Sequence, residues 1–368
     1  MRKIGIEEEF MLVDPETGRL KPVAGKLLQV HEELAAQGRT EPDEDIVDQE
    51  AFLQQIETAT APCTGLDDLG ADIVRARRAA GVAAEKAGAA AVAVPVPVLA
   101  AEDAQVTPKQ RHQQIFDEYG ETSRQSLVCG MHVHVDVDGE DEAVRVLDGI
   151  RPWLQILLAI SANSPYYHGR DTTFASWRSQ VWGRWPSAGP AEPFGSVTQY
   201  KQTIEKIIEW GAAVDDGMLY LDTRIAASLP TIEIRVADVC TEVEDVVLVA
   251  ALARALVQTA AVESDSREWR SDLLRSSTWR AARFGLSSTL VNPHTWELAP
   301  ARAVVDALRS HCEGALRDAG DWEWTADAFD RLMARGPGSA RQRAAFEATG
   351  SVDGVVADLV RRTAASWA

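Results

Sequence analysis

The order of apolar and polar residues predicts a chain in which strands and helices are mixed. Short apolar or alternating runs predict strands at residues 4–13, 53–60, 90–94, 127–137, 218–221 and 231–236. Apolar residues three and four positions apart predict helices at residues 66–86, 108–119, 141–160, 197–210, 242–262 and 267–284, and the pattern beyond Pro300 is almost purely helical. Because strands and helices do not alternate regularly, the sequence predicts an α+β fold, in which helices flank a sheet, with a helical C-terminal region at about 297–368.

Nothing in the sequence divides the chain into separate domains. There is no internal repeat and no low-complexity linker, and the segment 335–339 reads only as a surface break between two terminal helices. The chain has 368 residues, of which 46% are hydrophobic, so it can bury a substantial core. We therefore expect a single domain that spans residues 1–368.

Charge and cysteine usage narrow the possible partners and the compartment. The formal net charge of -19 repels phosphate backbones and anionic lipid surfaces, so neither nucleic acid nor a membrane is expected as a partner. The most apolar stretch, residues 246–262, is interrupted by Arg254 and Gln258 and is shorter than the ~20 residues of a membrane span. The first residues lack a secretory signal pattern, and the four cysteines are scattered, which favours a cytoplasmic protein with reduced thiols.

The first predicted strand carries two acidic residues on one face. Alternation places Glu7 and Glu9 together, ~7 Å apart along the strand, and Ile6 and Phe10 on the opposite face. A solvated run of charge at a sheet edge is the simplest explanation of one such pair. Similar pairs recur on other predicted strands, which favours a shared site instead.

Three further segments supply polar side chains of the same kind. His132 and His134 share one face of the strand at 127–137, and Glu233 and Arg235 share one face of the strand at 231–236. The segment 50–60 adds Glu50 and Glu57. If these faces coincide, the like charges would be destabilising without cations, and carboxylates with an imidazole suit Mg²⁺ or Mn²⁺ better than a structural zinc. Such a surface would gather Glu7, Glu9, Glu57, Glu233 and His132.

A long segment between predicted elements combines arginines with aromatic residues. Residues 163–186 contain Arg170, Arg178 and Arg184 among six aromatic side chains. A stacking surface for single-stranded nucleic acid has this composition, but the acidic chain disfavours that reading. A lid or specificity loop, whose guanidinium groups hold a carboxylate or phosphoryl group, is the better interpretation.

Several of these segments together resemble the carboxylate-amine ligase family, a branch of the glutamate-cysteine ligases. They occur in order across residues 1–290: Gly5–Phe10, Glu57–Thr60, Gly130–His134, Ser161–Pro165, the 170–186 loop and Glu233–Arg235. The resemblance implies a curved, mainly antiparallel sheet like that of glutamine synthetase, which holds ATP and several Mg²⁺ or Mn²⁺ ions. ATP is implied by the resemblance alone, because the sequence has neither a Walker A motif nor GxGxxG.

The resemblance also implies roles for individual residues. Arg235 matches the family arginine that faces the transferred phosphoryl group, and Arg178 matches a catalytic substrate contact. Asn163 and Arg170 resemble other substrate or nucleotide contacts, and His134 resembles a polar contact to the nucleotide or the sheet. The positions that match family metal ligands are Glu7, Glu9, Glu50, Glu57, His132 and Glu233.

The implied reaction is ATP-dependent amide formation through an acyl phosphate, with glutamate and cysteine as the default substrates. Its partners would be an amino-acid carboxylate, an amine and ATP, in a chain that is a possible homodimer. A metal-dependent hydrolase that uses the His132 and His134 pair is the main alternative, although the later histidines fall in loop or helix contexts. A non-catalytic, ligand-binding relative is the third reading.

Overall fold

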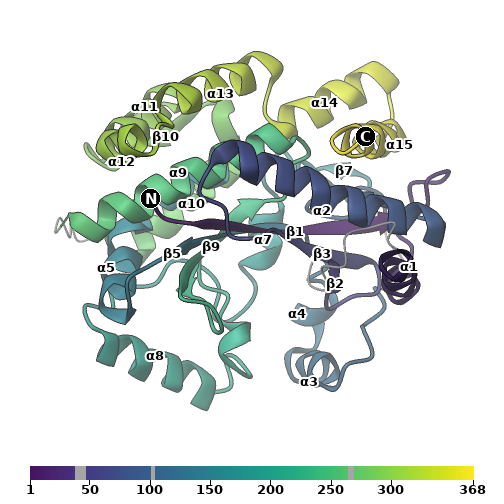
Figure 1. Ribbon diagram of the computed structural model, residues 1–368, viewed down its shortest axis with the longest axis horizontal. Coiled ribbons are helices and arrows are strands. Elements are labelled where there is room, and N and C mark those ends of the chain that lie inside the picture. The colour runs from purple at the N-terminus through teal and green to yellow at the C-terminus, as the bar shows by residue number, and fades with distance from the viewer. Residues whose placement is uncertain (38–46, 101–103, 264–268) are drawn as a thin grey trace.

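An antiparallel sheet forms the centre of the fold (Figure 1). In the computed structural model, which describes residues 1–37, 47–100, 104–263 and 269–368, the strand order is β2-β3-β1-β5-β9-β8, and β4 also pairs with β1. The strands are β1 (Ile4–Val13), β2 (Val47–Gln49), β3 (Gln55–Ala59), β4 (Ala90–Val92), β5 (Gly130–Asp136), β8 (Thr223–Ile225) and β9 (Thr231–Asp238). The two remaining described pairs are small hairpins, β6 (Tyr166–Tyr167) with β7 (Arg170–Asp171) and β10 (Thr289–Val291) with β11 (Leu298–Pro300).

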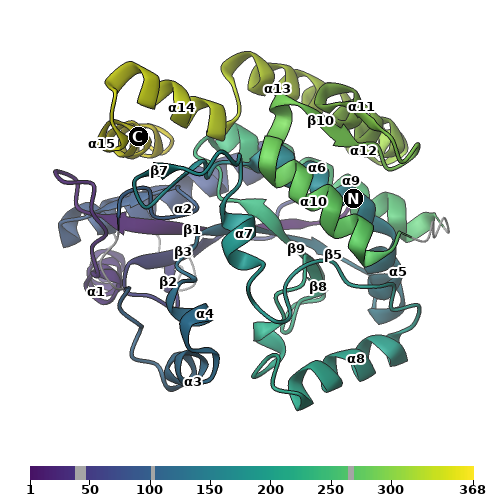
Figure 2. The same ribbon diagram turned by 180° about the vertical axis from the view of Figure 1, so that it is seen from behind.

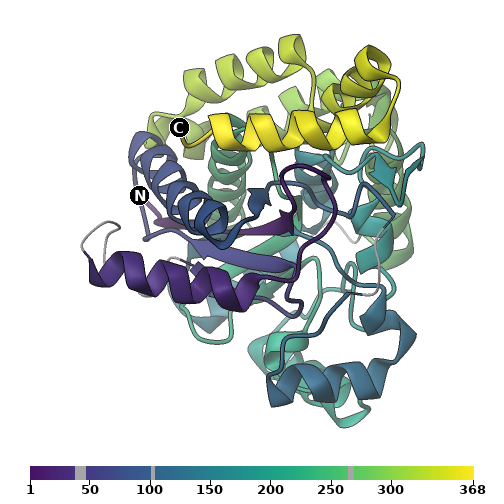
Figure 3. The ribbon, with the colours of Figure 1, turned by 90° about the vertical axis from the view of Figure 1, so that its right-hand side faces the viewer.

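Helices cover one face of this sheet in two layers (Figures 1 and 3). Helices α2 (Leu66–Ala87) and α9 (Val243–Val262) lie nearest the sheet, and the C-terminal helices lie beyond them. On the opposite side are α3 (Gln110–Tyr119), α4 (Glu121–Arg124) and α8 (Val197–Glu209). The other helices are α1 (Ala24–Ala36), α5 (Glu140–Ile150), α6 (Leu154–Ser161), α7 (Arg178–Trp182), α10 (Ser271–Phe284), α11 (Ala301–His311), α12 (Glu313–Ala319), α13 (Trp322–Arg335), α14 (Gly338–Thr349) and α15 (Val352–Ala365).

The predicted α+β fold with a helical C-terminal region is confirmed, and strand alternation explains where its core lies. Ile4, Ile6 and Phe10 point to the helix-covered face and are buried, as are their cross-strand neighbours on β5 and β3. Helix α9 is long and apolar enough to span a membrane, but 78% of its most apolar window is buried inside the protein. It therefore has the character of a central core helix.

A buried ion pair lies on the apolar face of the sheet. The guanidinium of Arg77, on α2, donates to both carboxylate oxygens of Glu8, with the shorter contact at 2.5 Å, and also to the backbone oxygens of Cys240 and Thr241. Arg77 and Glu8 are only 1% and 2% exposed. The Arg77–Glu8 ion pair and the hydrogen bonds of Arg77 connect α2 and the segment before α9 to the middle of β1.

Replacing Glu8 with alanine is expected to lower the free energy of unfolding by about 3–5 kcal/mol, because it leaves the Arg77 guanidinium buried without its counter-charge. Urea unfolding followed by circular dichroism measures the loss. The double variant Glu8→Leu with Arg77→Met is the control, and it should recover much of the stability. An equal loss of unfolding free energy in the single and double variants would show that the unpaired Arg77 charge is not the cause of the destabilisation.

Two predicted elements differ from the structure. The helix expected at 141–160 is two helices, α5 and α6, separated by a 3₁₀ turn at Arg151–Trp153, because Pro152 cannot donate the backbone hydrogen bond of a continuous helix. The strand expected at 218–221 is wrong: Asp216–Met218 is a 3₁₀ turn that the Asp215 side chain caps, and the edge strand β8 follows it.

Candidate active site

The sheet register brings the polar side chains of four strands together on the face opposite α2 and α9. On β1, Glu7 lies opposite His132 of β5, and Glu9 lies opposite Glu57 of β3. On β5, His134 lies opposite Glu233 of β9. Directly opposed residues project from the same face of a sheet, so these six acidic and imidazole positions form one continuous surface.

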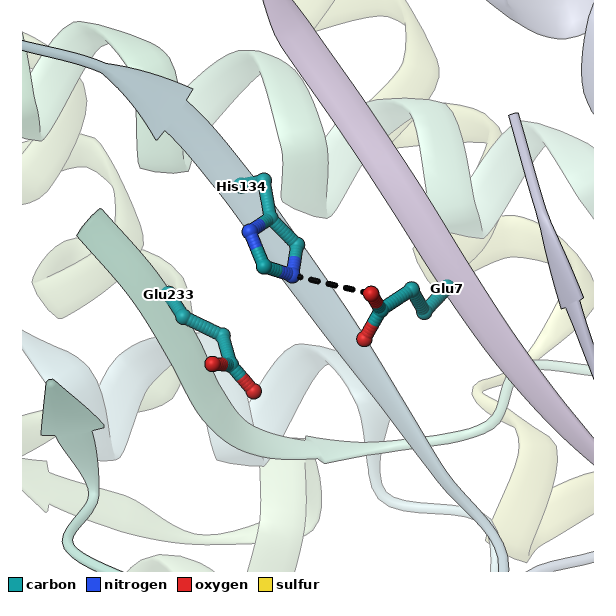
Figure 4. Close-up of side chains that lie close together, drawn as sticks. All are labelled: Glu7, His134 and Glu233. Carbon is teal, nitrogen blue, oxygen red and sulfur yellow. Dashed lines mark ion pairs between the residues drawn. The ribbon is translucent and has the colours of Figure 1, made fainter. Parts of the chain in front are cut away.

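The two histidines lie among the carboxylates rather than beside them. His132 Nδ1 is 3.1 Å from Glu7 Oε2 and 3.7 Å from Glu233 Oε1, and its Nε2 is 3.8 Å from Glu9 Oε1. His134 Nε2 is 3.3 Å from Glu7 Oε1, and Figure 4 shows Glu7, His134 and Glu233 converging from three adjacent strands. The predicted convergence of these side chains is therefore what the structure shows.

Glu7, Glu9, Glu57 and His132 line a cavity of about 360 Å³ between the sheet and α3. Glu50, which follows β2, enters it beside Glu9 and Glu57, and α3 contributes Arg111 and His112 to the opposite wall. Volumes of this order accommodate a small-molecule ligand. The cavity is strongly acidic on the sheet side.

Burial and crowding raise the pKa of the carboxyl groups at the β2–β3 end of the cluster. Burial, reinforced by the charge of Glu9, raises the pKa of Glu50 to about 7. Burial and the neighbouring acids, Glu50 foremost, raise the pKa of Glu57 well above its ordinary value. Burial also raises the pKa of Glu9, although the charge of Arg178 opposes this. A bound cation would therefore compete with protons at this end of the cluster.

The opposite end of the cluster is ionised. Burial disfavours the charged form of Glu7, but hydrogen bonds with His132 and His134 outweigh it and lower the pKa of Glu7. Burial of Glu233 is likewise outweighed, chiefly by the charge of Arg235, and its pKa falls to about 2. Burial, with the charge of Arg235, lowers the pKa of His132 to about 4, so its imidazole is neutral at neutral pH, as a metal ligand must be.

The donor set fits hard divalent cations. Ligand atoms lie within 4.8 Å of one another in three groups: Glu7, His134 and Glu233; Glu7, Glu57 and His132; and Glu9, Glu50 and Glu57. In addition, the Nε2 atom of His132 is buried and has no hydrogen-bond partner among the described residues. Each group has at most one imidazole, and oxygen-rich sites of this kind favour Mg²⁺ or Mn²⁺ over zinc.

Arg235 stands between this cavity and a second one. It lines both the acidic cavity and a neighbouring cavity of about 440 Å³, together with Trp182 and Trp185. Its guanidinium pairs with Glu233 and lies 5.8 Å from the ring centre of Trp182, while its Nε has no hydrogen-bond partner in the described part of the chain. Arg235 thus presents an unsatisfied donor where the two cavities meet.

Arg178 lies beside Arg235 and lines the second cavity. It begins the short helix α7, which contacts β9 near the centre of the molecule (Figure 2). Its side chain is only 2% exposed, and a Cβ atom at Gly130 would overlap its guanidinium. Part of the segment expected to be a lid is therefore buried in the wall of the second cavity. The absence of a side chain at Gly130 makes space for the guanidinium of Arg178.

Two of the sequence-predicted residues do not join the site. Asn163 is 1% exposed, and its side chain is taken up by hydrogen bonds with the Val239 oxygen, the Thr241 hydroxyl and the Gln342 amide, so it fastens α14 to the core. Arg170 is exposed on the β6–β7 hairpin and lines neither cavity. Neither side chain is placed to contact a ligand in these cavities.

The sequence reasoning missed Arg224. This residue donates from Nε to Glu233 at 2.7 Å and from Nη1 to the Gly217 oxygen at 2.8 Å, so it fixes the Glu233 carboxylate to the edge of the sheet. The strand that carries Arg224, β8, has only three residues, so the sequence offered no alternation by which to find it.

Comparisons with known proteins give relatives that match this chain along almost its whole length. Residues 3–359 match the family described as Glutamate-cysteine ligase family 2. A relative from Nocardioides sp., named "Putative glutamate--cysteine ligase 2-1", is 48% identical and is matched over 100% of this chain and 97% of its own length. A protein of the same name from Streptomyces avermitilis is 43% identical, with 99% of each chain covered.

Solved structures share the fold at low sequence identity. The glutamate-cysteine ligase of Francisella tularensis, in complex with AMP, has a TM-score of 0.65 at 11% identity, and the match covers 100% of this chain and 89% of that one. The bifunctional glutathione synthetase of Pasteurella multocida has a TM-score of 0.69 at 14% identity, and this chain, covered over 100%, spans 53% of that longer chain. The arrangement of sheet and helices is therefore one that other enzymes use.

Proposed function

Because the chain belongs to the glutamate-cysteine ligase family 2, we propose that it is an ATP-dependent carboxylate-amine ligase that forms an amide through an acyl phosphate. Glutamate and cysteine are the default substrates, as the names of its relatives suggest. The observation that carries the proposal is the convergence of Glu7, Glu9 and Glu57 with His132 on one wall of a cavity that Arg235 also lines. Glu233 contacts both His132 and Arg235.

The proposed reaction has two balanced steps. An oxygen of the substrate carboxylate attacks the γ-phosphorus of ATP, and ADP leaves. The amine nitrogen then attacks the carbonyl carbon of the acyl phosphate and loses a proton, and inorganic phosphate leaves. Both steps concentrate negative charge on phosphoryl oxygens, so positioned cationic donors are what the protein must supply.

Two arginines would supply those donors: Arg235, which lines both cavities, and Arg178, which lines the second. Arg235, with its unpartnered Nε, would donate to the phosphoryl group as it is transferred, and Glu233 holds its guanidinium in place. Arg178, which has an unpartnered Nε as well, would hold the carboxylate in line for attack. The indole of Trp182, over which both guanidinium groups lie, limits their movement and excludes water.

The acidic surface would hold the divalent ions that ATP requires. Glu7, Glu9, Glu50, Glu57, His132 and Glu233 are the proposed ligands, and His134 joins one of the ligand groups. Bound Mg²⁺ or Mn²⁺ would neutralise the phosphate oxygens and polarise the phosphorus. The hydrolase alternative is less well supported, because no group of ligand atoms among the described residues contains both histidines.

Hydroxylamine trapping tests the proposed function. The purified chain is incubated with ATP, Mg²⁺ or Mn²⁺, glutamate and hydroxylamine, and the hydroxamate and ADP are quantified. We expect both products in equal amounts, and neither without ATP or the metal. Omitting hydroxylamine and adding cysteine or other amines then identifies the natural acceptor. Failure to form hydroxamate or ADP with any amino-acid carboxylate would refute the ligase proposal.

The acidic cluster predicts an unusual pH dependence of stability. The carboxyl of Glu50 has an ordinary pKa of 4.5 and a pKa of about 7 in the folded chain, so the folded state binds the proton more tightly. Its contribution to stability is present below pH 4.5 and is lost as the pH rises through about 7. Without divalent ions, Tm is expected to fall across this window.

Added Mn²⁺ should reverse that trend, because it binds the deprotonated carboxylates. The increase in Tm caused by Mn²⁺ should therefore grow as the pH rises from about 4.5 to about 7. Differential scanning calorimetry with and without chelator measures both effects. An increase that is the same at each pH would show that these carboxylates do not bind the ion.

A further inference from the structure

A buried carboxylate lies at the end of β9, at a position where strand alternation would place an apolar side chain. Ile232, Ile234 and Val236 alternate along β9 and are buried, and the next alternate position is Asp238. Asp238 is 0% exposed and lines neither of the two cavities. A carboxylate is buried to this extent only when hydrogen-bond donors compensate for the water that it loses.

The donors to Asp238 come from one segment, residues 163–176. The backbone N–H of Asn163 and the hydroxyl of Ser164 donate to Oδ2 at 2.9 and 2.7 Å, and the hydroxyl of Ser176 donates to Oδ1 at 2.9 Å. All three residues are at most 1% exposed. The three hydrogen bonds therefore hold both ends of the loop that contains the β6–β7 hairpin against the end of β9.

Ser164 also fixes the start of α7. Its Oγ, which donates to Asp238, accepts the backbone N–H of Arg178 at 3.0 Å. One hydroxyl group thus connects Asp238 to the backbone of Arg178. The guanidinium of Arg178 is much less constrained, because Nη2 makes one long contact with the Arg235 oxygen, at 3.4 Å, and Nε has no partner among the described residues.

Two other features at the end of β9 act on Arg178. Gly130 is the residue of β5 that lies opposite Asp238, and a Cβ atom at Gly130 would overlap the Arg178 guanidinium. Burial lowers the pKa of Arg178, and the charge of Asp238 opposes this more than any other group does. The backbone position, the available space and the charge of Arg178 therefore all depend on the residues around Asp238.

We propose that Asp238 is a positioning residue, which acts through Ser164 and Ser176 to set the place of Arg178 in the second cavity. The inference rests on the proposed function, in which Arg178 holds the reacting carboxylate. An arginine whose backbone is fixed before the substrate arrives loses little conformational freedom when it binds a carboxylate, and it holds that group closer to the geometry of attack.

Asp238→Asn tests this role with little change of shape. The amide oxygen can replace Oδ2 and accept from Asn163 and Ser164. The amide NH₂ group would then face the hydroxyl of Ser176, which can accept a hydrogen bond as well as donate one. The substitution therefore keeps a set of partners for each group, while it removes the charge and weakens the hydrogen bonds that hold the segment.

A second variant and a control accompany it. Ser164→Ala keeps Asp238 but removes the hydroxyl that connects it to the Arg178 N–H. Ser277→Ala is the matched control, because Ser277 is also buried, at 3% exposure, and its hydroxyl donates only within α10, to the Leu274 oxygen. Thermal unfolding of each variant gives the temperature at which all of them are folded.

The hydroxamate assay at that temperature gives kcat and the KM values for glutamate and ATP. In Asp238→Asn and Ser164→Ala, KM for glutamate is expected to rise and kcat/KM for glutamate to fall about 10- to 100-fold, because a displacement of about 1 Å in a substrate-holding group has an effect of that order. KM for ATP should not change, and Ser277→Ala should match the parent chain. If only kcat falls, as a smaller folded fraction would cause, the proposal is overturned.

A double-mutant cycle shows whether Asp238 acts through Arg178. Asp238→Asn is combined with Arg178→Met, which removes the guanidinium and keeps most of the side-chain volume. We expect Asp238→Asn to lower kcat/KM for glutamate in the parent chain but to change it less than about 2-fold in the Arg178→Met background. The same factor in both backgrounds would show that Asp238 acts on something other than Arg178.

Binding measurements separate this proposal from the proposed function. Glutamate is titrated calorimetrically into the full chain with a non-hydrolysable ATP analogue and Mg²⁺. If the parent chain forms no hydroxamate, but Asp238→Asn and Ser164→Ala weaken glutamate binding and Ser277→Ala does not, the ligase proposal falls and the positioning role stands. If hydroxamate forms, but Asp238→Asn and Ser164→Ala keep the parent KM and Kd for glutamate, the ligase proposal stands and the positioning role falls.

Discussion

Replacement of Arg235 by lysine is expected to lower kcat by about 10³-fold, because a guanidinium that stabilises a phosphoryl-transfer transition state contributes at least that factor. Lysine keeps the charge but loses the planar fork and the Nε donor that is free at the junction of the two cavities. ATP binding should change little, since the acidic surface and its ions carry most of it. The measurement is kcat and KM for ATP in the hydroxamate assay.

Arg224 provides the matched control for this experiment. Both arginines contact Glu233, but Arg224 also donates to the backbone oxygens of Asp216, Gly217 and Leu219. These additional hydrogen bonds indicate that Arg224 stabilises the fold. Arg224→Lys is therefore expected to lower the free energy of unfolding, whereas Arg235→Lys lowers kcat and leaves unfolding almost unchanged. A fall in Tm for Arg235→Lys as large as that for Arg224→Lys would remove the catalytic interpretation.

Glu57→Gln is expected to lower activity by about 10²- to 10³-fold while it raises Tm in the absence of divalent ions. The carboxyl group of Glu57 lies beside those of Glu9 and Glu50, and burial together with these neighbouring acids raises its pKa. An amide of the same shape removes this electrostatic repulsion. The same substitution removes a proposed metal ligand. A loss of activity together with a gain in stability would indicate that the Glu57 carboxylate contributes to ligand binding and does not stabilise the fold.

Differential scanning calorimetry with chelator and the hydroxamate assay with saturating Mg²⁺ measure the two effects. Glu205→Gln, on the exposed face of α8, is the control for the loss of one negative charge and should leave both quantities unchanged. A Glu57→Gln variant that is less stable than the parent chain without metal would show that the carboxylate supports the fold.

Much of the candidate site could be predicted from the sequence because strand alternation has a fixed period. Once β1 is recognised, Glu7 and Glu9 must share a face that Ile6 and Phe10 do not, and the same holds for His132 with His134 and for Glu233 with Arg235. Arg224 escaped because β8 is only three residues long, too short for alternation to be visible.

The burial of each side chain and its hydrogen-bond partners could not be predicted, because they depend on segments far apart in the chain. Asn163 and Arg170 lie in the same arginine-rich region as Arg178, yet Asn163 is buried against α14 and Arg170 is exposed on a hairpin. Only Arg178 reaches the cavity, because Gly130 on β5 leaves space for its guanidinium. No local pattern separates these three residues.

The sequence by itself determined which side chains share each face of a strand, because the direction of a side chain follows from the local backbone period. The tertiary structure alone decided which faces meet: antiparallel pairing sets Glu9 against Glu57 and Glu7 against His132. It also decided that Asp222 and Arg275, 53 positions apart in the numbering, line one cavity with Arg235. The physical reason is that long-range pairing and burial are properties of the whole packed chain, which no window of sequence contains.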